Sequence, residues 1–145
     1  MDEPFPPVTP GIGRAHHVVL DCPDPASLAD FYAALLGLPV TYRSADFVVV
    51  AASDRASGFA FQRAPDHRPP QWPDPAHPQQ MHLDVMVEDP AAARALVLGL
   101  GARALPGGQD VYADPAGHPF CLITRPAWAE PIPPGSGQQP SPGGG

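Results

Sequence analysis

His17-Val18-Val19-Leu20-Asp21-Cys22-Pro23-Asp24-Pro25 decides the fold, because its pattern returns later in the chain as His82-Leu83-Asp84-Val85-Met86-Val87-Glu88-Asp89-Pro90. The His, Asp and Pro residues of the two stretches correspond at one common offset. Each stretch leads into an apolar, helix-like segment that closes with Leu-Gly, at Leu36-Gly37 and at Leu100-Gly101. Two matching units in so short a chain predict one pseudo-symmetric domain.

Composition separates this domain from its surroundings. Prolines gather at both ends of the chain and between the repeats, and the C-terminal end lacks the periodic apolar residues that could offset the entropy of ordering. The predicted organisation is a disordered tail over residues 1–13, a domain over 14–124 made of repeats 14–63 and 80–124 joined by a Pro-rich loop over 64–79, and a disordered tail over 125–145.

Charge and hydropathy exclude several classes of partner. The formal net charge is −7 and no cluster of Lys or Arg occurs, so nucleic acid would be repelled. The chain lacks an apolar run of the roughly 20 residues that a membrane-spanning helix needs, which predicts no membrane partner and a cytoplasmic location. Two cysteines are too few for a disulfide framework.

Periodicity predicts the elements of each unit. Apolar and polar side chains alternate over 82–87 and, more weakly, over 17–22, as in strands with one buried face. Each Asp-Pro step fits an N-cap carboxylate followed by Pro at the first helical position, so we expect helices from Pro25 and Pro90 that end at the glycines. Further strands are expected at about 40–43, 47–52 and 59–63, and at about 103–104, 111–113 and 119–124. Each unit is therefore βαβββ.

Two such units predict an α+β fold in which a concave mixed sheet encloses a cavity and the helices cover its outer face. Alternation assigns one set of side chains to the cavity: His17, Val19, Asp21, Ala60, Gln62, His82, Asp84, Met86, Pro119, Cys121 and Ile123. Of these, His17, Gln62, His82 and Cys121 are interpreted as equivalent places in the two repeats.

Several motifs recur in an order that is specific for one family. They are the paired units, an opening His with Asp seven residues later, a helix with Phe31-Tyr32 that ends in Leu-Gly-Leu, and the closing phrase 114–120. This combination over 14–124 resembles the vicinal oxygen chelate superfamily, also called glyoxalase/bleomycin resistance/dioxygenase, and the loop 72–75 running into 79–84 resembles its glyoxalase-like domain proteins. The superfamily includes lyases, isomerases, epimerases, dioxygenases, thiol transferases and non-catalytic drug-binding proteins, so the resemblance implies the fold and selects no activity.

The resemblance implies a metal-ligand set on the opening and closing strands of both units, at His17, Gln62, His82 and Cys121. Gln and Cys stand where metal-dependent members typically have Glu. Two imidazoles, an amide oxygen and a thiolate would suit Zn²⁺ better than Mg²⁺ or Mn²⁺. An Fe(II) dioxygenase and a glyoxalase I reaction are both disfavoured, because each needs a carboxylate that this set lacks.

Each candidate residue also has a structural interpretation. The two histidines and Gln62 can bind an organic ligand through hydrogen bonds alone, and Cys121 can be a small buried hydrophobe, with Met86 as a ligand-binding neighbour. Asp84, on the same face as His82, could orient its imidazole or act as a base, or be a solvated carboxylate. Trp72 could close over the cavity mouth or anchor the loop to the core.

Two hypotheses for function follow. The favoured one is a binding or resistance-type protein that holds a small organic molecule in its cavity without metal, because the ligand set is incomplete. The alternative is a metal-dependent lyase or isomerase in which Zn²⁺ is the cofactor and Asp84 moves a proton. In either case the resemblance and the exposed sheet edges predict a homodimer.

Overall fold

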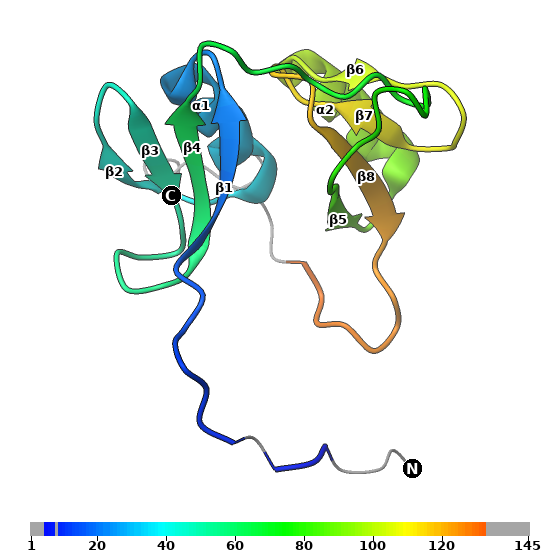
Figure 1. The fold of residues 1–145 in the computed structure, drawn as a ribbon. Helices are drawn as coiled ribbons and strands as arrows, with labels where there is room; N and C mark the ends of the chain where they lie inside the picture. The colour runs from blue at the N-terminus through cyan, green and yellow to red at the C-terminus, as the bar shows by residue number, and fades with distance from the viewer. Residues whose placement is uncertain (1–4, 8, 133–145) are drawn as a thin grey trace, which may run out of the picture.

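Two βαβββ units follow one another along the chain (Figure 1). The computed structural model describes residues 5–7 and 9–132. The first unit contains β1 (His17–Cys22), α1 (Pro25–Leu36), β2 (Val40–Arg43), β3 (Phe47–Val50) and β4 (Gly58–Arg63). The second contains β5 (Leu83–Val87), α2 (Pro90–Leu100), β6 (Arg103–Ala104), β7 (Val111–Ala113) and β8 (Pro119–Thr124). The linker between them, residues 64–82, contains neither helix nor strand.

The eight strands form two four-stranded sheets with the same topology. Their orders are β1-β4-β3-β2 and β5-β8-β7-β6, and in each sheet the first strand of the unit runs parallel to the last. The other pairs are antiparallel. The α+β fold with two pseudo-symmetric units is therefore confirmed, with the strands divided between two mixed sheets that lie side by side (Figure 1).

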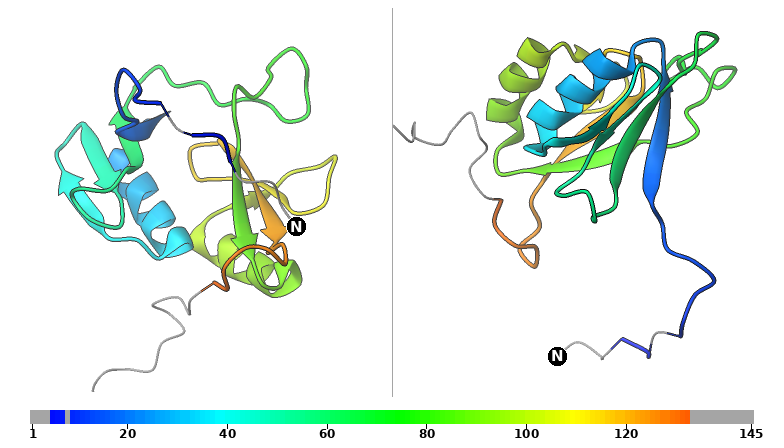
Figure 2. Two further views of the ribbon diagram at one scale, coloured as in Figure 1. Left: turned by 90° about the horizontal axis from the view of Figure 1, so that it is seen from below. Right: turned by 90° about the vertical axis from the view of Figure 1, so that its left-hand side faces the viewer.

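Both helices begin and end where the sequence predicts. Asp24 and Asp89 are N-caps whose side chains accept hydrogen bonds from backbone N–H groups inside the first turn, and a Pro follows each of them. The helices end at Gly37 and Gly101, with φ of 66° and 115°, a region that favours glycine. α1 and α2 pack next to each other on one side of the two sheets (Figure 2).

One hydrophobic core extends through both units. It includes the back-face residues that alternation predicts, among them Cys22, which is fully buried, and Val85. Phe31 of α1 packs against Phe120 of β8 with ring centroids 5.9 Å apart. Val18 differs from the prediction: although it alternates with Cys22, it is 42% exposed. The shared core fixes how the two sheets face each other.

Residues 125–132 extend past β8 and are tied to the body by one carboxylate. Arg125 Nε donates a 2.7 Å hydrogen bond to Glu88 Oε1, and Ile132 N donates to the same oxygen. Arg125 Nη1 also donates to the carbonyl oxygen of Ala129 at 2.8 Å. The sequence predicted disorder from residue 125 onward, but these contacts place residues 125–132 against the domain. The rest of that predicted tail, 133–145, lies outside the described residues.

Within the described residues, no helix combines the length and apolar character needed to cross a membrane.

Candidate functional site

The strand register changes which residues of the two units correspond. In the first unit Val19 pairs with Ala60, and in the second Asp84 pairs with Cys121. Since Val19 and Asp84 hold the same place in the two opening strands, the residue equivalent to Cys121 is Ala60. The sequence equated Cys121 with Gln62 because the closing phrases align by residue type. The hydrogen-bonded register instead pairs Gln62 with Asp21.

Consequently, the predicted four-ligand set is not assembled. His17 pairs with Gly58, four residues before Gln62, so these two side chains are separated by roughly 13 Å along the strands. Nδ1 of His17 accepts a hydrogen bond from the N–H of Gly58 at 3.3 Å. Burial and the neighbouring His16 ring lower the pKa of His17, which favours its neutral form.

A cluster of three potential metal ligands forms on the front of the second sheet. One ligand atom each from His82, Asp84 and Cys121 lie within 4.8 Å of one another. Nε2 of His82 is 3.3 Å from Oδ1 of Asp84, and Asp84 is the direct strand partner of Cys121. The structure thus brings together two of the predicted ligands with the residue predicted to act beside them. We call these three residues the His82 cluster.

The donor chemistry of the His82 cluster fits Zn²⁺. An imidazole nitrogen, a carboxylate oxygen and a thiolate sulfur are all ligands that this ion takes, and three protein ligands leave a fourth position for water or substrate. Burial, together with the charge of Asp84, raises the pKa of the Cys121 thiol. The thiol is therefore protonated at neutral pH, and an ion that binds there has to displace its proton.

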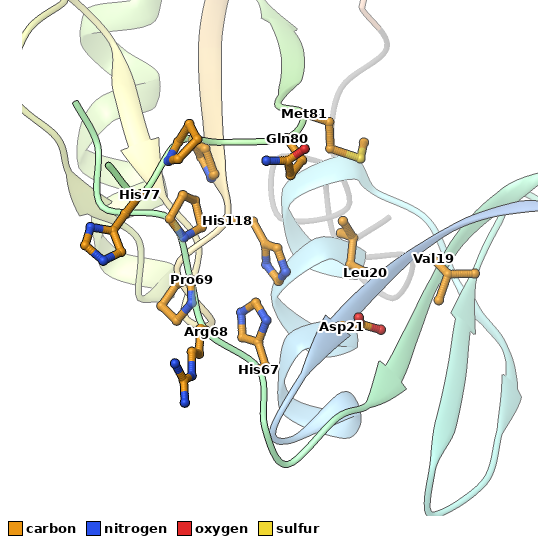
Figure 3. A pocket seen from close by; sticks show the side chains of 13 residues that line it. Val19, Leu20, Asp21, His67, Arg68, Pro69, His77, Gln80, Met81 and His118 are labelled. Carbon is orange, nitrogen blue, oxygen red and sulfur yellow. The ribbon is translucent and has the colours of Figure 1, made fainter. Parts of the chain in front are cut away.

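The main pocket lies elsewhere, between β1 and the linker (Figure 3). Its volume is about 400 Å³, a size that accommodates a small organic molecule. It is lined by residues 19–21 of β1, residues 67–70, 77, 78, 80 and 81 of the linker, His118 of the β7–β8 turn and Pro119, the first residue of β8. Of the predicted cavity residues, only Val19, Asp21 and Pro119 line it. Those that do not are His17, Ala60, Gln62, His82, Asp84, Met86, Cys121 and Ile123, and the loop residue Trp72 does not line it either.

A second, smaller cavity of about 30 Å³ lies between the two units. It shares Leu20, Met81, His118 and Pro119 with the main pocket, and His82 also lines it. His82 therefore belongs both to the His82 cluster and to the lining of the smaller cavity. His118 contributes to both cavities.

A buried hydrogen-bond network supports His118. The side chain of Asp114, in the turn between β7 and β8, is 0% exposed. Its Oδ2 accepts a 2.6 Å hydrogen bond from Tyr32 Oη and lies 2.8 Å from Nδ1 of His118. Its Oδ1 also accepts hydrogen bonds from the backbone N–H groups of Ala116 and His118. Burial, followed by the charge of Asp114, raises the pKa of Tyr32, so the phenol stays protonated and donates.

His67 of the linker completes this wall of the pocket. Its ring stacks on His118 with centroids 4.9 Å apart, and its Nε2 lies 3.0 Å from the carbonyl oxygen of Ala116. Figure 3 shows the His67 and His118 imidazoles pointing toward each other. The sequence pattern does not predict this network, because Tyr32 and Asp114 are 82 residues apart and meet only in the folded chain.

The two remaining candidates lie away from the pocket. Nε1 of Trp72 donates a 2.7 Å hydrogen bond to the carbonyl oxygen of Pro106, in the loop between β6 and β7. This contact favours the anchoring role for Trp72 over closure of the cavity mouth. Met86 is 39% exposed on β5, where it pairs with Ile123.

Several solved structures share the fold. The chain is similar to a glyoxalase-related enzyme from Fulvimarina pelagi at 16% identity, with a TM-score of 0.58 over 88% of this chain and 96% of that one. A glyoxalase/bleomycin resistance protein from Albidiferax ferrireducens has 21% identity and a TM-score of 0.50, covering 77% and 98%. The fosfomycin resistance protein FosX from Mesorhizobium loti has 15% identity and a TM-score of 0.52, covering 80% and 94%. At these identities the likeness shows the fold alone.

The sequence comparison gives the family. No curated protein sequence matches the chain. The family model described as "Glyoxalase-like domain" matches residues 17–123, a span that runs from the first residue of β1 into the last strand and contains the pocket and the His82 cluster. The chain therefore belongs to the glyoxalase-like domain family and has the vicinal oxygen chelate fold.

Proposed function

We propose that the protein binds a small organic molecule in the pocket between β1 and the linker. The observation that carries this proposal is the pocket itself, about 400 Å³, walled by both units and by the linker that joins them. Its lining mixes apolar side chains such as Leu20 and Met81 with a few polar ones such as His118. That combination is typical of ligand sites, in which apolar area supplies affinity and few polar groups supply orientation.

A metal-independent mode of binding is supported by where the pocket lies. None of the three residues of the His82 cluster lines it, and its polar groups are imidazoles, a guanidinium, an amide and one carboxylate. Affinity in such a site comes from apolar burial and hydrogen bonds. Two neighbours in fold are described as a bleomycin resistance-type and a fosfomycin resistance protein, which is compatible with a role in holding or neutralising a toxic small molecule.

The test is a ligand screen against a matched pair of variants. Val19 lines the pocket and is partly exposed, so Val19→Trp fills it without disturbing the core. Tyr42→Trp introduces the same side chain on β2, away from the pocket. Molecules that bind the wild type and Tyr42→Trp by ligand-observed NMR should lose affinity for Val19→Trp. If no molecule distinguishes the two variants, the pocket is not the binding site.

The His82 cluster supports a second candidate, a metal-dependent lyase or isomerase. A ring nitrogen of His82, a carboxylate oxygen of Asp84 and the Cys121 thiolate would hold the ion. A Zn²⁺ ion with an open position would polarise a substrate oxygen. The carboxylate oxygen of Asp84 that does not bind the ion could exchange a proton with the substrate. Chelator sensitivity of ligand binding or turnover would favour this candidate, whereas insensitivity favours the metal-independent one.

We also propose that the protein is a homodimer. Three leucines of α2 are exposed, with Leu96 at 61%, Leu98 at 38% and Leu100 at 41%. A second copy could cover these side chains, as symmetric partners commonly do. Light scattering at micromolar concentration should give the dimer mass, and Leu96→Glu should lower it. The cytoplasmic location expected from the sequence stays a prediction that cell fractionation can test.

A further inference from the structure

The buried network at the pocket wall fixes which nitrogen each imidazole presents. Nδ1 of His118 contacts the carboxylate of Asp114, at 3.0 Å from Oδ1 and 2.8 Å from Oδ2. A carboxylate oxygen only accepts, so Nδ1 carries the proton and donates it. The other nitrogen, Nε2, then has a free lone pair. In the neutral ring it can only accept a hydrogen bond.

The same argument applies to His67. Its Nε2 lies 3.0 Å from the carbonyl oxygen of Ala116, which also only accepts, so Nε2 carries the proton and Nδ1 has the lone pair. Both rings line the main pocket. The polar part of this wall therefore consists of two hydrogen-bond acceptors, and a ligand that faces it gains most by bringing a donor.

His118 is held more firmly than a surface histidine. Its side chain is 16% exposed, its ring stacks on His67, and its Nδ1 partner Asp114 is fixed by Tyr32 Oη. A ring with its rotamer and tautomer fixed loses little freedom when it accepts a hydrogen bond, which strengthens discrimination between ligands. The negative charge of Asp114 behind the ring also makes Nε2 a better acceptor.

Apart from Asp21, Arg68, His77 and Gln80, the remaining lining of the pocket is apolar. Pro69, Pro70, Pro78 and Pro119 present ring surfaces, and Leu20 and Met81 add aliphatic and thioether surface. Flat, rigid walls of this kind suit a planar apolar body, which loses little entropy on binding.

We propose that His118 is the specificity-determining residue of this pocket and selects planar apolar ligands that carry a hydroxyl donor, the phenol class of molecule. This inference rests on the proposed ligand-binding function of the pocket. The ligand hydroxyl donates to Nε2 of His118, and the aromatic body packs on the prolines. A ligand that is identical except for the missing O–H leaves Nε2 unpaired in a partly desolvated wall and binds more weakly.

A matched pair of probes tests the proposal. 2-Naphthol has the donor and 2-methoxynaphthalene, its methyl ether, lacks it. The wild type should bind 2-naphthol about tenfold more tightly than the ether, the value of one hydrogen bond that is lost. His118→Phe keeps a stacking ring without the acceptor, so its preference should fall to near unity. His16→Phe makes the same change at an exposed position outside the pocket and should keep the preference.

A measurement on the wild type covers the case in which His118→Phe fails to fold. In ¹⁵N NMR spectra, His118 should be in the Nδ1–H tautomer, and its Nε2 resonance should shift with 2-naphthol and not with the ether. Equal affinities for the two probes, or the Nε2–H tautomer at His118, would overturn the inference. If screened molecules bind the pocket without preference for a hydroxyl, the proposed function stands and this inference fails. If Val19→Trp has no effect on any ligand, both fail.

Discussion

Tyr32 of α1 and Asp114 of the β7–β8 turn are joined by a 2.6 Å hydrogen bond that spans 82 residues of sequence and links the two repeats. Both side chains are buried, so this bond is made in a low-dielectric environment. It holds the second unit to the first and supports His118 at the same time.

Tyr32→Phe should lower the free energy of unfolding by about 1.5–3 kcal/mol, because it removes a hydrogen bond to a buried charged group and leaves Asp114 with one donor fewer. Tyr112→Phe is the matched control, since its hydroxyl contacts of 3.3 and 3.4 Å are longer and partly exposed. Urea unfolding of both variants measures the difference. Equal losses of unfolding free energy in the two variants would mean that the Tyr32–Asp114 hydrogen bond stabilises the fold no more than the contacts of the Tyr112 hydroxyl.

Cys22→Ala should change how stability depends on alkaline pH. Burial, reinforced by nearby Asp114, raises the pKa of Cys22 from 9.0 to about 11. As pH rises, the Cys22 thiol keeps its proton to a higher pH in the folded state than in the unfolded state. The stability that the protonated thiol contributes is therefore full below pH 9.0 and is lost as pH rises toward about 11. A shift of this size corresponds to about 2–3 kcal/mol.

The window between pH 9.0 and 10.0 is the informative one, because above it the raised pKa of Tyr32 adds a second loss of the same sign. Urea unfolding in this window should show a steeper fall in stability for the wild type than for Cys22→Ala. Parallel slopes would show that the thiol ionises as easily in the folded protein as in the unfolded chain.

The His82 cluster and the ligand set implied by family resemblance predict different effects of substitutions on metal binding. If the His82 cluster holds Zn²⁺, then His82→Ala, Asp84→Ala and Cys121→Ala should each weaken Zn²⁺ binding by at least about tenfold, and His17→Ala should leave it unchanged. Affinity should rise with pH, because the raised pKa of Cys121 makes the ion compete with a proton. Isothermal titration calorimetry measures both effects. Loss of binding in His17→Ala would restore the set implied by family resemblance.

Trp72→Phe should loosen the linker by removing the donor to Pro106 while keeping an aromatic ring. We expect faster hydrogen exchange over residues 64–82 and a stability loss of about 0.5–1.5 kcal/mol, the usual range for one hydrogen bond. Trp128→Phe, at a residue that is 87% exposed, is the control and should change neither. Unchanged exchange in the linker of Trp72→Phe would mean that prolines alone keep it in place.

Glu88→Gln should release residues 125–132. The Arg125 guanidinium and the N–H of Ile132 hold the pKa of Glu88 below its usual range, which shows that both contacts favour the ionised carboxylate. Without that charge, hydrogen exchange and proteolysis after β8 should accelerate while the core stays protected. Asp30→Asn, which removes the exposed contact with Arg43, is a control elsewhere on the surface.

Local signals in the sequence predicted most of the fold. Asp24 and Asp89 each precede a Pro at the start of a helix, and a glycine with positive φ ends each helix. Each helix boundary is therefore marked by one residue or by two neighbouring residues in the sequence. Alternation also placed Cys22 and Val85 on the buried face. The strand ranges agree with the structure to within one or two residues.

The site was harder to predict because its geometry depends on pairing between distant residues. The equivalence of Cys121 with Ala60 follows from hydrogen-bond register, which residue type alone does not encode. The pocket is walled mainly by the linker, where no periodicity guides prediction. The Tyr32–Asp114 bond needs the complete fold before the two residues meet.

The linker has a consequence for how this protein could have acquired its pocket. The two sheets and their shared core are built from the repeats, whereas most of the pocket wall comes from the segment that connects them. Two separate copies of one unit could pair and bury the same kind of core, but they would have no such wall. The proposed ligand binding would thus depend on the covalent fusion, and a single protease cut between Arg68 and Trp72 should abolish it while leaving both units folded together.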